Sequence, residues 1–135
     1  MININENNNN SINLDENNSE NSDDYSNSTR LSSIRFNQDN SYILCGSHIN
    51  QNKNEKSEIY LYDLTKKKKE TIKGHYDDIN SVTFLNRKEN DNIFLSGGDD
   101  GLILIWDKRI LGIKRDKAIG KLVGHHSGVT YISSR

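Results

Sequence analysis

Three side chains of the types used in nucleophilic catalysis lie in the second half of the chain: His75, Ser96 and Asp100. In a Ser–His–Asp triad the imidazole takes the proton of the serine hydroxyl, and the carboxylate orients the imidazole. Ser96, however, lacks the surrounding Gly-x-Ser-x-Gly turn that exposes the nucleophile of α/β-hydrolases. We therefore assign no catalytic residue and expect that the protein is not an enzyme.

The histidines and the single cysteine are the candidate metal ligands. His125 and His126 are adjacent, and together with His48 they show no spacing typical of a metal site. Cys45 lies in a predicted strand, where a small buried apolar residue is the ordinary role of cysteine. The sequence therefore predicts neither a metal nor a cofactor.

A run of consecutive lysines, Lys66 to Lys69, could contact phosphate or act as a localisation signal. The run lies between two predicted strands, and no surrounding basic excess accompanies it, since the formal net charge is −1. No aromatic residues are interleaved with the lysines. A solvated hairpin tip is the favoured interpretation, and no nucleic-acid partner is expected.

Composition and length set further bounds. With 135 residues and one cysteine the chain forms at most one domain without a disulfide framework, which favours a reducing, intracellular compartment. No apolar run approaches the ~18 to 20 residues that span a bilayer, and the N-terminus lacks the features of a signal peptide, so neither a membrane nor secretion is expected. Residues 1–28 are dominated by Asn, Ser, Asp and Glu. This composition predicts a disordered tail. A recognition motif or a phosphorylation tract is the alternative.

The stretch from Phe94 to Arg109 is predicted to form a β-hairpin. Between two apolar runs, Asp99-Asp100-Gly101 predicts a two-residue turn, because glycine adopts a positive φ without a Cβ clash and aspartate tolerates that region. The apolar residues from Leu102 to Trp106 are consecutive rather than alternating. This pattern predicts a strand that is covered on both faces.

Gly74-His75 lies upstream of Trp106-Asp107, and this spacing of Gly-His and Trp-Asp resembles the WD-repeat family of β-propellers. Tyr62-Asp63 stands in the same place one repeat earlier, and Gly124-His125 one repeat later. The resemblance implies that His75, Ser96, Asp100 and Trp106 form a structural chain of hydrogen bonds from indole to hydroxyl, imidazole and carboxylate. We call these four residues the tetrad.

The resemblance implies an all-β fold, a partial WD-repeat propeller with two four-stranded blades and the start of a third. Residues 29–135 form this segment, with blades at about 31–73 and 75–123 and the start of a third at 125–135. The residues after Ser47 replace the usual Asp turn with a polar insertion. The strands are expected at 31–36, 42–46, 58–63, 69–73, 79–84, 93–96, 102–106 and 118–123, followed by 129–132.

Two blades and the start of a third cannot close a ring, since propellers have four to eight blades. We therefore expect the missing blades to come from a longer chain, of which this sequence is a fragment or truncated product, or from another chain. The sheet faces that carry Val82, Phe84, Ile103 and Ile105 are expected to remain partly exposed without them.

The sequence Trp106-Asp-Lys-Arg109 resembles the box that substrate receptors of cullin-4 RING ubiquitin ligases carry at the end of this hairpin. The resemblance implies that Asp107 and Arg109 bind the cullin-4 adaptor. An arginine fork can make bidentate contacts across an interface where lysine offers only a point charge. The flanking segments 77–82, 116–125 and 128–132 are similar to the family of the eleventh cullin-4-associated factor and its plant relatives.

The implied function is that of a substrate-receptor subunit of a cullin-4 RING ubiquitin ligase, acting in proteasome-mediated protein degradation in the nucleus or the cytoplasm. The partners would be the cullin-4 adaptor and a substrate that the sequence does not identify. A generic WD-repeat scaffold of another complex, in which Arg109 is only a surface charge, is the alternative. A third interpretation is a non-functional truncated fragment.

Overall fold

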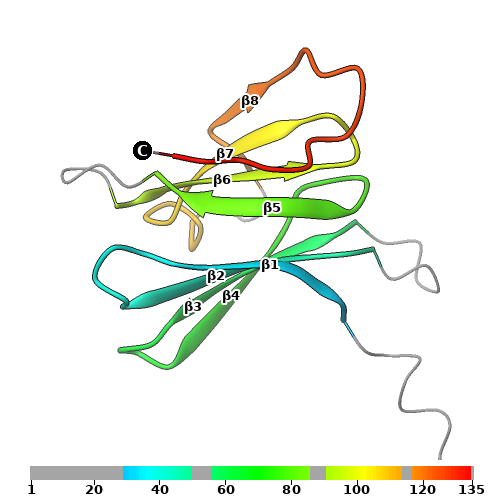
Figure 1. The fold of residues 1–135 in the computed structure, drawn as a ribbon. Helices are drawn as coiled ribbons and strands as arrows, with labels where there is room; N and C mark the ends of the chain where they lie inside the picture. Colours follow the sequence, from blue (N-terminus) through cyan, green and yellow to red (C-terminus); the bar gives the residue numbers. More distant parts are fainter. Residues whose placement is uncertain (1–28, 50–55, 86–90, 114–116, 135) are drawn as a thin grey trace, which may run out of the picture.

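The computed structural model describes residues 29–49, 56–85, 91–113 and 117–134. These residues form two antiparallel four-stranded sheets, each in the strand order of the sequence. In Figure 1 the two sheets lie one above the other. The first sheet, which we call blade 1, contains β1 (Leu31–Phe36), β2 (Tyr42–Ser47), β3 (Glu58–Asp63) and β4 (Lys68–Lys73). The second, blade 2, contains β5 (Ile79–Phe84), β6 (Ile93–Gly98), β7 (Ile103–Asp107) and β8 (Gly120–Leu122).

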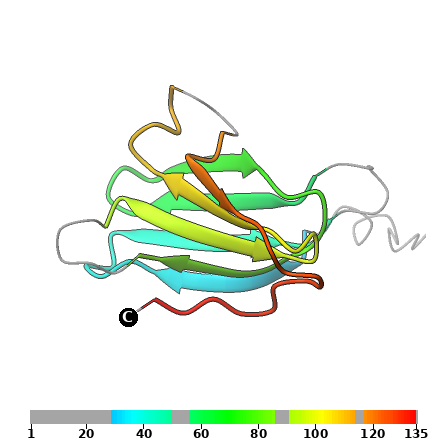
Figure 2. The same cartoon turned by 90° about the horizontal axis from the view of Figure 1, so that it is seen from above.

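The predicted all-β fold with two four-stranded blades is confirmed. Each of the eight strands of the two blades overlaps a span that the sequence predicts. The last strand is shorter than its predicted span of 118–123, because only Gly120–Leu122 pair with β7. The predicted strand at 129–132 does not form, and this segment runs along blade 2 in an extended course (Figure 2). The proposed tail at 1–28 and most of the insertion after Ser47 lie outside the described residues.

The hydrophobic core lies between the blades. Blade 1 contributes one face of alternating residues, including Leu44, Ile59 and Leu61, and blade 2 contributes a face that includes Phe94 and Trp106. The Phe94 and Trp106 rings are stacked with centroids 6.2 Å apart. The core thus depends on the contact between two sheets, and neither blade has a second buried apolar face of this extent.

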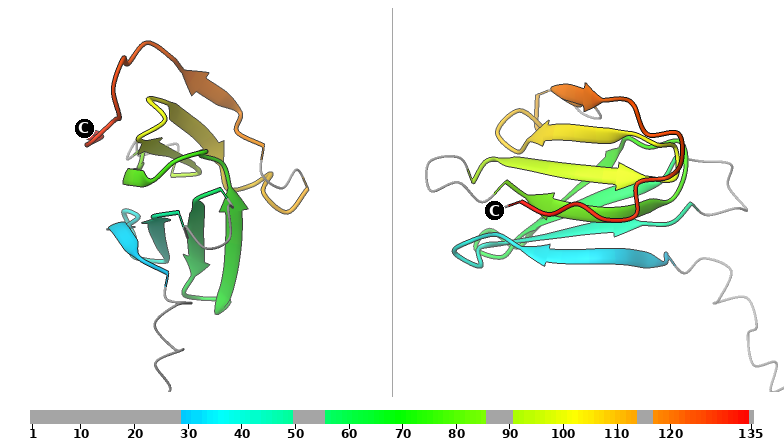
Figure 3. Two further views of the ribbon diagram at one scale, coloured as in Figure 1. Left: turned by 90° about the vertical axis from the view of Figure 1, so that its right-hand side faces the viewer. Right: turned by 45° about the horizontal axis from the view of Figure 1, so that its top comes forward.

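Glycines on β2 and β6 make room for the first strand of the following repeat, which we call its inner strand. A Cβ on Gly46 would lie 2.6 Å from Ile79 Cγ2 and 3.1 Å from Val82 Cγ1. One repeat later, a Cβ on Gly97 would lie 2.7 Å from Val129 Cγ1, and Ile132 fills the place that corresponds to Val82. The segment after His125 therefore packs on blade 2 in the same way as β5 packs on blade 1. Figure 3 shows this segment passing alongside β5 and β6.

The turn between β6 and β7 differs from the predicted two-residue form. Gly98 and Leu102 are joined by a backbone hydrogen bond from Gly98 N to Leu102 O, so three residues form the loop. Within this loop only Gly101 has a positive φ, of 73°. This geometry is that of a three-residue hairpin with glycine in the left-handed position, so Asp100 does not need to enter that region.

The sequence predicts partial exposure of Val82, Phe84, Ile103 and Ile105, and only the first two differ from this prediction. Val82 and Phe84 are 0% and 1% exposed because they pack against blade 1. On β7, Leu104 and Trp106 are buried, whereas Ile103 and Ile105 are only partly buried. The strand is therefore covered fully on one face only, within the part of the chain that the structure describes.

Candidate functional site

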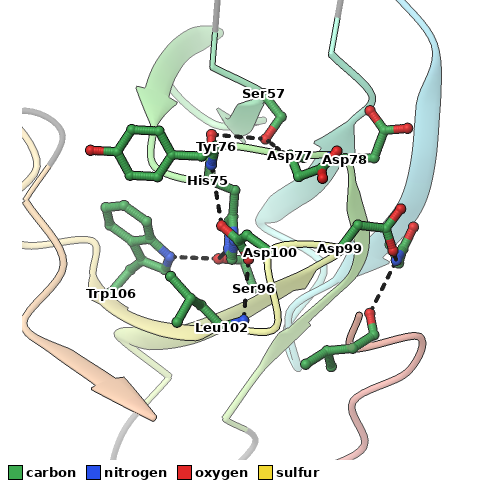
Figure 4. Close-up of polar contacts among 12 residues, drawn as sticks. Ser57, His75, Tyr76, Asp77, Asp78, Ser96, Asp99, Asp100, Leu102 and Trp106 are labelled. Atoms are coloured by element: carbon green, nitrogen blue, oxygen red, sulfur yellow. Dashed lines mark hydrogen bonds and ion pairs between the residues drawn. The ribbon is translucent and has the colours of Figure 1, made fainter. Parts of the chain in front are cut away.

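The tetrad residues come together at one end of blade 2 (Figure 4). The Trp106 indole N–H donates to Ser96 Oγ at 2.9 Å, and Ser96 Oγ lies 2.7 Å from His75 Nε2. His75 Nδ1 lies 3.0 Å from both carboxylate oxygens of Asp100. Asp100 also accepts backbone N–H groups of Tyr76 and Leu102, at 3.2 and 3.1 Å. The chain of contacts therefore links the β6–β7 turn to the segment that precedes β5.

These contacts select one tautomer of His75. Nδ1–H donates to Asp100, which leaves Nε2 as the acceptor of the Ser96 hydroxyl proton. The Ser96 oxygen in turn accepts the indole proton. Each polar group of the buried set thus has a partner, which a buried network needs to be stabilising. His75, Ser96 and Trp106 are each 0% exposed, so no substrate reaches the serine hydroxyl in this fold.

Blade 1 has no counterpart of this network among its described residues. The strand register places Cys45 at the position of Ser96 and Tyr62 at the position of Trp106. Burial raises the pKa of the Cys45 thiol. At the corresponding end of blade 1, two buried serines form hydrogen bonds with the backbone instead. Ser47 Oγ accepts the Glu58 N–H at 2.9 Å, and Ser57 donates to Asp77 O at 2.7 Å. Sequence reasoning missed both serines, and only their place beside the insertion could have signalled them.

The candidate interaction site is at the opposite end of the strands, where β1, β3, β5 and β7 finish. We call this end the Arg109 rim, formed by residues 37–41, 64–67 and 108–113 (Figure 1). Asp107 ends β7 and caps the turn that follows, since its Oδ1 accepts the Arg109 N–H at 2.9 Å. The Arg109 side chain folds back on the same carboxylate, with Nε 3.0 Å from Oδ1 and Nη2 2.6 Å from Oδ2.

Burial and charge differ sharply between the two partners. The Asp107 side chain is 10% exposed, whereas that of Arg109 is 61% exposed. The hydrogen bond from the Arg109 side chain holds the pKa of Asp107 below its ordinary value. Arg109 Nε and Nη2 face Asp107, and the structure shows no acceptor for Nη1 among the described residues. The result is a guanidinium held in one orientation with its outer edge open to solvent.

Blade 1 repeats the capping aspartate but not the arginine. Asp63 occupies the position of Asp107, and its Oδ1 accepts the backbone N–H groups of Thr65 at 3.0 Å and Lys66 at 2.9 Å. Thr65 stands in the place of Arg109. The aspartate therefore serves the turn in both blades, and the exposed guanidinium is a feature of blade 2.

Lys108, between the two predicted site residues, contacts the neighbouring blade. Its Nζ lies 4.0 Å from the centroid of the Tyr42 ring and 3.7 Å from Asp91 Oδ2. Asp91 Oδ2 also accepts a hydrogen bond of 2.7 Å from Asn37 Nδ2. Sequence reasoning missed this link, because nothing in the local pattern places Lys108 beside residues of β2 and of the β1–β2 turn.

The remaining candidates are dispersed. His125 and His126 are exposed, and His48 forms a 3.3 Å ion pair with Asp78 when protonated. A search of the described residues finds no group of three or more side chains that could hold a metal ion. It likewise finds no helix long and apolar enough to cross a membrane.

Comparisons with known proteins agree on one kind of repeat. A family model described as "WD domain, G-beta repeat" matches residues 66–107. The chain is 34% identical over 104 residues to a Caenorhabditis briggsae protein named DDB1- and CUL4-associated factor 11 homolog, covering 76% of this chain and 17% of that protein. It is 36% identical over 104 residues to the LEC14B homolog of Prunus armeniaca, covering 76% of this chain and 20% of that protein.

Solved structures show the same arrangement of strands. A chain of the crystal structure of the mitotic checkpoint complex superposes with a TM-score of 0.58 at 25% identity, covering 76% of this chain and 28% of that chain. The described sheets are therefore similar to a part of a larger fold. The chain spans about a fifth of the length of the curated relatives that it matches.

Proposed function

We propose that this chain, which carries a WD repeat at residues 66–107, acts as a protein-interaction module in a substrate receptor of a cullin-4 RING ubiquitin ligase. In this role Arg109, held by Asp107 on the turn that follows β7, binds the cullin-4 adaptor, DDB1, and other surfaces of the propeller present a substrate. The relatives that support the proposal are similar to this chain over 104 residues. We propose that the protein acts in the nucleus, the cytoplasm or both.

The observation that carries the proposal is the geometry of Arg109. The Asp107 carboxylate holds the guanidinium through Nε and Nη2, while 61% of the side chain remains exposed. A fixed guanidinium loses little conformational entropy when it binds, so more of its interaction energy appears as affinity. Arginine is also among the residues that most often dominate the energy of protein interfaces.

The burial of the tetrad favours a structural role for these four residues over a catalytic one. Ser96 and His75 have no exposed surface, and the Ser96 oxygen already accepts the Trp106 indole proton. We propose that the four residues stabilise blade 2 and hold the β6–β7 turn. Ubiquitin transfer is then the work of other subunits of the ligase.

The exposed face of β1 supports the proposal that further blades complete the ring. Leu31 and Ile34 are 49% and 50% exposed. By register they correspond to Ile79 and Val82, which are buried against Gly46. Another blade, from a longer chain or another chain, would bury Leu31 and Ile34 in the same manner.

The test is to tag the endogenous protein at its N-terminus and purify it from its own cells, measuring whether DDB1 and cullin-4 come with it. We expect DDB1 to copurify with the natural protein and Arg109→Ala to reduce its recovery at least about tenfold. Thr65→Ala is the matched control, since Thr65 holds the equivalent position in blade 1 and is exposed. Absence of DDB1 from the natural protein, or its full retention by Arg109→Ala, would contradict the proposal and favour a scaffold of another complex.

A further inference from the structure

A hollow of about 140 Å³ opens on the Arg109 rim at the seam between the two blades. Its lining comes from both blades: Tyr42, Leu61, Asp63, Lys66, Lys68, Glu70 and Lys108. The volume is well above the ~10–15 Å³ that a single water requires, so the hollow has room for a small polar group. Since Lys108 lines it and Arg109 is the next residue, the hollow lies beside the proposed adaptor contact.

The two carboxylates in the lining are already engaged. Asp63 accepts the backbone N–H groups of Lys66 and Thr65, and the hydrogen bond from Lys66 is the main cause that holds its pKa below the ordinary value. Glu70 forms a 2.6 Å ion pair with Lys68. Both acids therefore have local cationic or N–H partners, and neither needs a ligand to balance its charge.

Two of the three lysines in the lining, Lys66 and Lys108, still have N–H donors to offer. Lys66 is exposed, and within the described residues its ammonium forms no ion pair, although its charge helps to hold the pKa of Asp63 below the ordinary value. Lys108 is only 14% exposed, and its ammonium is held between the Tyr42 ring and Asp91. An ammonium has three N–H donors, so the contacts with Tyr42 and Asp91 leave Lys108 able to donate to a further acceptor.

From this arrangement we infer that the hollow takes a carboxylate side chain, Asp or Glu, of the same protein partner that meets Arg109. Lys66 and Lys108 supply the donors, one from each blade. The inference rests on the proposed function, because it assigns the acidic side chain to the adaptor. It extends that function by making blade 1 a part of the docking surface.

The lining favours a side chain over a larger anion. Two carboxylates stand in the wall, so a doubly charged phosphate would face repulsion from Asp63 and Glu70 as well as attraction from the lysines. A single carboxylate placed between Lys66 and Lys108 meets two cations and adds one negative charge. The partner is thus a protein surface with an exposed acid at a fixed distance from its Arg109 contact.

The experiment compares two neighbouring lysines in the endogenously tagged protein. Lys66→Glu places a negative charge in the hollow, whereas Lys67→Glu makes the same change at an exposed residue outside the lining. We expect Lys66→Glu to reduce DDB1 recovery about fivefold or more, and Lys67→Glu to stay within about twofold, because an exposed charge outside the contact contributes little. The melting temperature of each purified variant shows that both remain folded.

A second measurement identifies the partner group directly. A zero-length carbodiimide reagent joins an amine to a carboxylate only when the two are in contact. We expect mass spectrometry of the crosslinked complex to find Lys66 or Lys108 joined to an Asp or Glu of DDB1.

The outcomes separate this inference from the function on which it rests. If DDB1 binds and Arg109→Ala weakens it, but Lys66→Glu behaves like Lys67→Glu, the hollow is not a contact and only this inference is overturned. If DDB1 does not copurify with the natural protein, both are overturned.

Discussion

The Ser81 hydroxyl accepts a hydrogen bond of 3.0 Å from the backbone N–H of Ile132. One repeat earlier, Ser33 Oγ accepts the N–H of Val82 at 3.3 Å. In each blade, a serine on the inner strand thus fixes the position of the inner strand of the next repeat along its own length. The segment 129–134 lies in the place of a third inner strand for this reason, although it forms no ladder in the structure.

Ser81→Ala should loosen this segment. The substitution removes the acceptor of a buried N–H, which costs about 1 kcal/mol or somewhat more. We expect the amide hydrogen of Ile132 to exchange faster, as measured by NMR or mass spectrometry. Ser33→Ala is the matched control, because it should accelerate exchange at Val82 and leave Ile132 unchanged. An unchanged exchange rate at Ile132 in Ser81→Ala would contradict this account.

Gly97→Ala should disturb the same contact by steric means. The new Cβ would lie 2.7 Å from Val129 Cγ1 and 2.9 Å from Ile132 Cδ1, both too close for an undisturbed fit. We expect a loss of about 1–3 kcal/mol in the free energy of unfolding, measured with urea. Gly112→Ala serves as the control, since nothing lies within 4 Å of its Cβ position. Equal free energies of unfolding for the two variants would argue against the proposed packing of Val129 and Ile132 on Gly97.

Trp106→Phe should test the tetrad as a structural network. Phenylalanine keeps much of the stacking on Phe94 but removes the N–H that Ser96 accepts. We expect a loss of about 2 kcal/mol from the hydrogen bond and the smaller volume together. A double-mutant cycle with Ser96→Ala should show that the two losses are not additive, because both variants break one contact. Strict additivity would mean that the two side chains act independently.

The Asp107–Arg109 pair should make stability depend on acid pH. The pKa of Asp107 is lower in the folded protein than in the unfolded chain, so its ionised form stabilises the fold above the unfolded value of about 3.9. This contribution is lost as the pH falls through the folded-state pKa. Asp39 and Asp63 also have lowered pKa values and act in the same direction.

Urea unfolding of the natural protein and of Asp107→Asn at about pH 7 and about pH 3 isolates the contribution of Asp107. We expect Asp107→Asn to be the less stable at neutral pH and the difference to shrink in acid. Arg109→Ala should raise the carboxyl pKa of Asp107, as followed by NMR titration, because the guanidinium is the first cause of its lowering. A pKa unchanged by Arg109→Ala would contradict this cause.

Much of the fold follows from local pattern. The alternation of apolar residues on β1, β3 and β5, and turn residues such as Asp99-Asp100-Gly101, locate the strands because period and turn chemistry act within a few residues. The residues of the tetrad and of the Arg109 turn stand at positions that the family resemblance indicates. The sequence by itself therefore determined the blades and the candidate residues.

The relations between blades required the tertiary structure. Val82 and Phe84 are buried rather than partly exposed, since blade 1 covers them. Lys108 reaches Tyr42 across the seam, and Gly46 receives Ile79. These contacts join residues far apart in the chain, and their partners depend on how one twisted sheet is placed on the next. Local periodicity carries no information about that placement, so the hollow beside Arg109 could be found only in the folded molecule.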